Sequence, residues 1–201
     1  KANLPSADAQ EVRSSVIILM PCFSSSVDTP LEYVASTGSQ YVDAGFKITS
    51  SDVITTRFYC NGKGNASILG SRASATSSNY MLFSTGSDLT IDFGTSSHRL
   101  TVGYASGTWY DAVMSSGYMA ITNVATGDLV GEDTKSGSSG ESPGNCYLFW
   151  GSGSPPNSNP KFSGRIARFK AVRGEEVRAD YWPCQRAGEV GFVDLRDGSF
   201  H

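Results

Sequence analysis

Residues 31–46 most constrain what this chain can fold into. Apolar and polar residues alternate on both sides of a Ser36-Thr37-Gly38 break, which is the pattern of two short strands joined by a turn. The 201 residues include 22 glycines, and only 17% are charged, a composition that disfavours a helical bundle. We therefore predict an all-β protein.

Strand-like segments recur through the rest of the chain at the spacing of a β-sandwich. In segment 53–60, for example, Ile54, Phe58 and Cys60 share one face. We predict strands at 39–46, 53–60, 66–72, 79–84, 88–93, 98–104, 108–114, 118–123, 128–131, 145–151, 161–173, 177–182 and 189–194. The length suits one sandwich domain over 31–201, preceded by an N-terminal leader or docking segment over 1–30.

Charge and hydropathy exclude two classes of partner. The net charge is −3 and no basic cluster is present, so nucleic acid and anionic membranes are poor partners. The longest apolar run, residues 16–20, is far shorter than the roughly 20 residues of a membrane-spanning helix. We expect no membrane span.

Four cysteines lie far apart in the sequence and form no CxxC pair, which excludes common zinc-finger and thioredoxin-like motifs. Among the three pairings that two disulfides allow, we favour Cys22–Cys184, because both residues flank the ends of the domain and chain termini often lie close together. The alternative is four buried free thiols.

Three blocks of sequence carry a family resemblance. They are 33–46, with Gln40-Tyr41-Val42-Asp43; 107–130, with a strand that contains Trp109 followed by a small hairpin; and 147–200, with Phe162-Ser163-Gly164-Arg165-Ile166 and Asp180-Tyr181-Trp182-Pro183-Cys184. In order and spacing they resemble the laminin-G-like, concanavalin A-type jelly-roll modules of bacterial surface and phage structural proteins. The resemblance covers about 31–201. It implies two antiparallel sheets packed face to face, with the first and last strands near one another.

A hydrolase is not expected. Glycosidases need two carboxylates across the cleaved bond, and enzymes on this jelly roll usually carry them on one strand as Glu-x-Asp-x-x-Glu. This sequence has no such strand, because Glu132-Asp133 falls in a predicted loop and Glu175-Glu176 in a predicted turn. A Gly-x-Ser-x-Gly nucleophile motif is also absent from the sequence.

Carbohydrate binding needs exposed aromatic rings beside amide or carboxylate groups. Trp150 ends a predicted strand and opens a loop that contains Asn157 and Asn159, so these three residues are the first candidate site. Tyr80 and Asn79 are the second.

The remaining tryptophans and the acidic residues have simpler interpretations. We predict that Trp109 belongs to the core, since it lies within an alternating strand and matches the core tryptophan that the resemblance implies. Trp182 precedes Pro183, and we predict that it belongs to the core too. Many laminin-G-like modules bind Ca²⁺ through loop carboxylates, for which the candidates are Asp43, Asp88, Asp92 and Asp128. Their spacing is not clustered, so we expect no cofactor.

We predict a non-enzymatic, secreted or surface-displayed module that binds a glycan or another cell-surface ligand, or acts in adhesion. The alternative is a structural or decoration subunit of a phage particle, tail or surface filament, in which residues 1–30 dock into a neighbouring subunit by strand addition. The first function places the protein outside the cell or on its surface, and the second places it in a virion.

Overall fold

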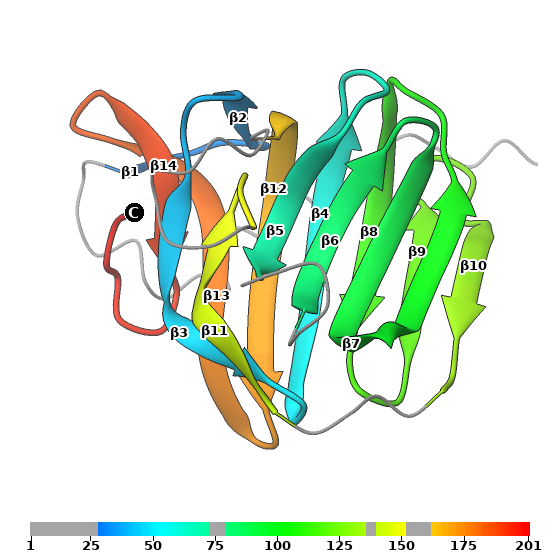
Figure 1. Cartoon of the computed structure of the whole chain (residues 1–201). Helices are drawn as coiled ribbons and strands as arrows, with labels where there is room; N and C mark the ends of the chain where they lie inside the picture. The colour runs from blue at the N-terminus through cyan, green and yellow to red at the C-terminus, as the bar shows by residue number, and fades with distance from the viewer. Residues whose placement is uncertain (1–27, 73–78, 136–139, 152–161) are drawn as a thin grey trace, which may run out of the picture.

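The protein folds into two antiparallel β-sheets packed face to face (Figure 1). The computed structural model describes residues 28–72, 79–135, 140–151 and 162–201. The strands are β1 (Asp28–Pro30), β2 (Val34–Thr37), β3 (Val42–Thr49), β4 (Asp52–Cys60), β5 (Ala66–Ser71), β6 (Asn79–Thr85), β7 (Asp88–Gly103), β8 (Thr108–Met114), β9 (Met119–Asn123), β10 (Leu129–Asp133), β11 (Glu141–Leu148), β12 (Ser163–Arg173), β13 (Glu176–Arg186) and β14 (Glu189–Asp194).

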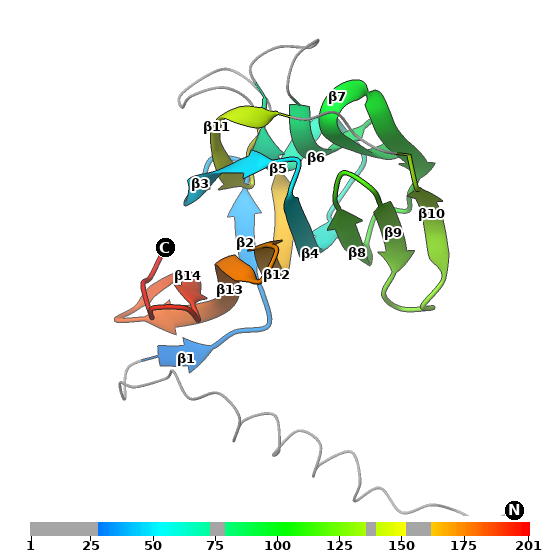
Figure 2. The same cartoon turned by 90° about the horizontal axis from the view of Figure 1, so that it is seen from below.

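One sheet, here called the large sheet, has the order β1-β13-β12-β4-β8-β9-β10, with β14 also paired to β13 and β2 to β12. The other, the small sheet, has the order β3-β11-β5-β6-β7. Figure 2 shows the two sheets as separate layers. The predicted all-β, two-sheet jelly-roll sandwich is confirmed. The predicted strands at 53–60, 66–72, 79–84 and 108–114 lie within a residue of β4, β5, β6 and β8.

The two strands predicted within residues 31–46 are present, but they do not pair with each other. β2 pairs with β12 in the large sheet, and β3 pairs with β11 in the small sheet. The Gln40 side-chain oxygen accepts hydrogen bonds from the Thr37 backbone N–H (3.0 Å) and the Ser36 hydroxyl (3.1 Å). Gly38 adopts a φ of 91°, which glycine tolerates without steric cost. The Ser-Thr-Gly break is therefore the crossing from one sheet to the other.

β7 turns back on itself. Within this strand Thr90 lies beside Thr101, Asp92 binds Arg99, and the Phe93 carbonyl lies 3.2 Å from the His98 ring. The Tyr104 N–H donates to the Ser87 carbonyl at the open end. These contacts share one antiparallel register, so β7 is a hairpin of two arms (Figure 1), as the separate predictions of 88–93 and 98–104 had indicated.

The core lies between the inner faces of the sheets. Along β4 the residues with even numbers point inward and are buried, while Val53 and Arg57 point outward. Ile54 and Phe58 are completely buried and belong to the same core cluster as Phe46, Phe169 and Tyr181 of β3, β12 and β13. Complete burial of each large apolar side chain contributes about 2 kcal/mol.

The two ends of the described chain meet at β13. β1 and β14 both pair with this strand, as the expected proximity of first and last strands requires. The large sheet thus already includes Asp28–Pro30, which the sequence analysis assigned to the leader. Cys22 lies outside the described residues, and Cys184 is buried opposite Pro30. No disulfide joins Cys60, Cys146 and Cys184 to one another, and the Cys22–Cys184 pairing stays a prediction.

Candidate functional site

Trp150 is not an exposed ring. Its side chain is completely buried, with ring centroids 5.2 Å from Tyr41 and 5.5 Å from Tyr147. The backbone bends at Phe149, which has a φ of 62°, so the segment does not continue as a straight strand into the following loop. The prediction that Trp150 presents an exposed stacking face is therefore wrong. Asn157 and Asn159 lie outside the described residues.

The second predicted site is also covered. Tyr80 is completely buried on β6, and Asn79 beside it is 1% exposed. The Tyr80 hydroxyl donates a 2.8 Å hydrogen bond to the Gly140 carbonyl, and its ring packs edge-on against Phe93. Burial raises the pKa of Tyr80, with further contributions from the charges of Asp52 and Glu141. Both side chains are therefore buried and present no face to a ligand.

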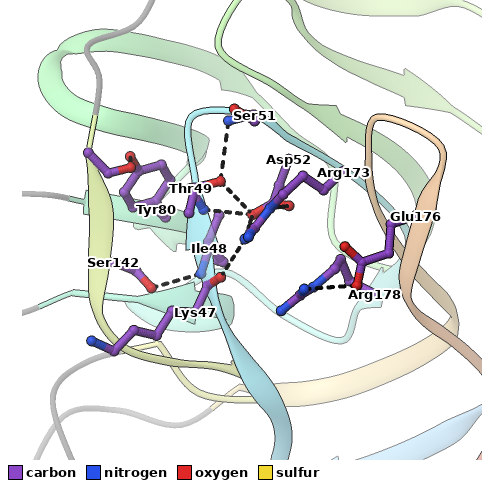
Figure 3. Close-up of polar contacts among 11 residues, drawn as sticks. Lys47, Ile48, Thr49, Ser51, Asp52, Tyr80, Ser142, Arg173, Glu176 and Arg178 are labelled. Carbon is purple, nitrogen blue, oxygen red and sulfur yellow. Dashed lines mark hydrogen bonds and ion pairs between the residues drawn. The ribbon is translucent and has the colours of Figure 1, made fainter.

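A polar cluster around Asp52 joins the two sheets at the β3–β4 turn (Figure 3). The buried Asp52 carboxylate accepts the Thr49 N–H at 2.6 Å and two hydrogen bonds from Arg173, at 2.9 and 3.0 Å. Arg173 also donates to the Lys47 carbonyl at 3.2 Å. All of these bonds are internal, so the cluster fastens β3 to the end of β12 and has no group directed to a ligand.

The outer face of the large sheet is different, because a bulge in β12 changes which side chains point outward. Ile166 pairs with Phe58, but Arg168 pairs with Arg57, so Ala167 is the extra residue. Ile166 and Phe169 can therefore both be buried, while Arg165 and Arg168 both reach the outer face. Without the bulge, strict alternation would direct one of these arginines into the core.

A groove of about 590 Å³ lies on this outer face. Its lining comes from β4, β8, β12 and β13 and from the segment between β1 and β2, and consists of Leu31, Glu32, Thr55, Thr56, Arg57, Asp111, Ala112, Val113, Ala167, Arg168, Lys170 and Trp182. The guanidinium of Arg168 lies 4.6 Å over the half-buried Trp182 ring. This contact combines a large apolar surface with a cation at one wall of the groove.

Ion pairs fix the charged side chains of the groove. Arg57 donates two hydrogen bonds to Asp111, at 2.8 and 2.7 Å, and this interaction raises the pKa of Arg57. Asp180 lies 3.1 Å from Lys170 and 3.6 Å from Arg168. Because these ion pairs already restrict the side chains, the side chains lose little further entropy when they form hydrogen bonds with a ligand.

An aromatic cluster, here called the outer aromatic cluster and made of Tyr33, Tyr59 and Trp109, adjoins the groove. The ring centroids of Tyr59 and Tyr33 lie 5.3 and 6.0 Å from that of Trp109. The guanidinium of Arg165 lies 4.5 Å over Tyr33 and 4.7 Å over Tyr59. All four side chains are half-buried, so part of each remains accessible.

The predictions that Trp109 and Trp182 belong to the core are wrong. Both are half-buried on the outer face. Parity along the strands could have indicated this, because Trp109 alternates with the buried Tyr110 and shares its face with Asp111. Trp182 likewise alternates with the buried Tyr181 and shares its face with Asp180.

The acidic residues considered for calcium have other partners or stand apart. Asp43 accepts hydrogen bonds from the Gly45 N–H and the Asn145 side chain, and Asp92 is bound by Arg99. Over the described part of the chain, no three His, Cys, Asp or Glu side chains are grouped so that they could hold a metal ion. In the same residues no helix has the length and hydropathy to cross a membrane.

Comparison with solved structures identifies the fold. The mouse laminin α1 chain, domains LG4–5, matches over 81% of this chain and 44% of its own, with 20% identity and a TM-score of 0.51. A heptameric pentraxin from Limulus polyphemus matches over 72% of this chain and 75% of its own (13% identity, TM-score 0.41). The active domain of bacteriophage CBA120 tailspike protein 2 matches over 74% and 28% (17% identity, TM-score 0.42).

The match to the laminin domains shows that the fold is a laminin-G-like jelly roll. The chain spans less than half of the laminin chain that it matches, and at 20% identity the likeness concerns the fold alone. No family model matches the sequence. A search of curated proteins likewise finds no match.

Proposed function

We propose that this protein is a non-enzymatic glycan-binding module, secreted or displayed on a surface or virion, and that the groove on the outer face of the large sheet is its binding site. The observation that carries the proposal is the position of Trp182 and the charged pairs of Arg57 and Arg168 along one groove. This replaces the site first predicted at Trp150.

The chemistry of the groove suits a sugar. The partly exposed indole of Trp182 supplies an apolar surface for the C–H face of a pyranose ring. Asp111 and Arg57 can accept and donate hydrogen bonds to neighbouring hydroxyls, and Lys170 adds another donor beside them. The groove lies on the outer face of the large sheet, a position that suits recognition of a chain from one side.

Trp182→Ala tests the site. On a glycan array and by calorimetry with the glycans that bind, we expect this variant to lose about tenfold or more in affinity, because it removes the largest apolar contact of the groove. Tyr118→Ala is the matched control, since Tyr118 is 37% exposed and does not line the groove. Equal affinities of the wild type and Trp182→Ala would contradict the proposed site.

We further propose that binding requires neither catalysis nor a metal. The groove contains Glu32 and Asp111, but Asp111 is held in an ion pair with Arg57. Incubation with the bound glycan should release no reducing ends, and EDTA should leave the affinity unchanged. Either release of product or loss of binding in EDTA would contradict this part of the proposal.

A role in assembly is the second candidate, and β1 favours it. This strand adds only three residues to β13, and the N–H of Leu31, the residue after it, also donates to the Pro183 carbonyl at 3.0 Å. The sheet edge at β13 therefore accepts an added strand. Loss of oligomers on size-exclusion chromatography after removal of residues 1–30 would support assembly through this segment, and an unchanged elution volume would argue against it.

A further inference from the structure

Arg165 differs from Arg57 and Arg168 on the same outer face because it has no acid partner. Among the described residues, Arg57 pairs with Asp111 and Arg168 with Asp180. Arg165 forms no ion pair and no side-chain hydrogen bond there, and its guanidinium lies over Tyr33 and Tyr59 instead. Glu32 is the residue before Tyr33, but the described contacts include no ion pair between Glu32 and Arg165.

We propose that Arg165 binds a carboxylate of the ligand, so that the groove recognises an acidic sugar, one that carries a uronic or sialic acid. This inference rests on the proposed glycan-binding function and names its substrate class. The aromatic rings attract the cation and restrict its rotamers, but they accept no conventional N–H···O hydrogen bond. The N–H groups of the planar guanidinium therefore remain available for an anion, which this group can bind with two parallel hydrogen bonds.

The strand register places Arg165 next to the groove. Arg165 pairs with Tyr59, and Tyr59 lies two residues from Arg57 on the same face of β4. Two residues of a strand span about 6.5 Å, close to the length of one sugar residue. A sugar stacked in the groove at Arg57 would therefore place its neighbour along the chain at Arg165 and the outer aromatic cluster.

Arg168 shows why the missing acid partner matters. Arg168 also lies over an aromatic ring, that of Trp182, but Asp180 is 3.6 Å from its guanidinium. An anionic ligand at Arg168 would have to displace or approach this carboxylate, which opposes binding. At Arg165 no carboxylate among the described residues has to be displaced.

The experiment compares oligosaccharides that end in glucuronic, galacturonic or sialic acid with their methyl esters, which keep the sugar and remove the charge. We expect wild-type protein to bind at least one acid about tenfold or more tightly than its ester. Arg165→Gln should remove this preference and leave the ester affinity within about twofold. Arg165→Lys, which keeps the charge without the planar fork, should retain part of the preference.

Arg178→Gln is the control, because Arg178 also lies over an aromatic ring (Phe46) but pairs with Glu176 outside the groove. It should keep the full preference for the acid. Equal binding of every acid and its ester by wild type would overturn the inference and leave the groove proposal intact. Loss of acid and ester affinity to the same degree in both Arg165 variants would also overturn it. If Trp182→Ala binds both as the wild type does, the proposed function fails instead.

Discussion

Two aromatic clusters in this protein have similar composition, but their tryptophan rings differ in exposure. Tyr41, Tyr147 and Trp150 form one cluster, in which the tryptophan ring is completely buried. Tyr33, Tyr59 and Trp109 form the other, in which all three rings are half-buried on the outer face of the large sheet. Each contains two tyrosines and one tryptophan, so residue type alone does not distinguish a structural cluster from one available to a ligand.

The two tryptophans differ in exposure because their backbone segments are placed differently. The segment that contains Trp150 is bonded back to the small sheet, since the Phe149 N–H donates to the Ile68 carbonyl and the Phe162 N–H donates to the Phe149 carbonyl. Trp109 lies in the middle of a regular sheet, where a side chain that points outward stays accessible unless another segment crosses it. The segment between β1 and β2, which brings Leu31 and Tyr33, lies against part of this face.

The largest expected effect comes from removing the buried ring. Trp150→Ala should lower the free energy of unfolding by about 3–5 kcal/mol, because it leaves a cavity under Tyr41 and Tyr147. Trp109→Ala should cost only about 1–2 kcal/mol, since much of its ring is already in water. Urea unfolding followed by circular dichroism measures both. If both variants lost the same free energy of unfolding, the Trp150 and Trp109 rings would not differ in burial.

A second prediction concerns two aspartates that bind arginine in the same bidentate way. Asp52→Ala should cost about 3 kcal/mol, because it leaves the Thr49 N–H and Arg173 without their buried partner. The value lies at the low end for buried pairs because the Arg173 side chain is 31% exposed. Asp111→Ala, on the outer face, should cost at most about 1 kcal/mol. The same denaturant titrations measure both, and a larger loss for Asp111 would contradict the assignment of Asp52 as the structural anchor.

A third prediction concerns Cys60, on the inner face of β4, and the pH dependence of its contribution to stability. Burial raises the pKa of the Cys60 thiol from 9.0 to about 12, so between these values the folded state holds a proton that the unfolded state releases. The stability that this thiol contributes is therefore complete below pH 9 and is lost as pH rises toward 12. The expected slope is up to about 1.4 kcal/mol per pH unit.

Unfolding of wild type and Cys60→Ala at several values between pH 8 and 10.5 measures this linkage. The variant should lack the part of the alkaline decrease that Cys60 contributes. Parallel curves for the two proteins would show that the thiol is not buried as described. The other buried groups with raised pKa values, such as Tyr80, are present in both proteins and cancel in the comparison.

Most strands could be predicted because their signal is local. In β4 and β8 the side chains alternate with a period of two residues, and turn residues bound each segment. The two arms of the β7 hairpin were also predicted, as the separate strands 88–93 and 98–104. The strand β1 was not predicted, because it has only three residues. β2 was predicted, but its pairing was not, because its partner β12 lies more than 120 positions later in the chain.

The sequence by itself determined the all-β class and the alternation that separates the two faces of a strand such as β4. The tertiary structure alone decided which of those faces is covered. Trp150 is buried because its backbone returns to the small sheet, and Arg165 and Arg168 are both on the outer face because a bulge shifts the register of β12. Alternation along the sequence shows on which face of a strand a residue lies. Whether that face is buried depends on which distant segments pack against it, and no local sequence pattern shows this.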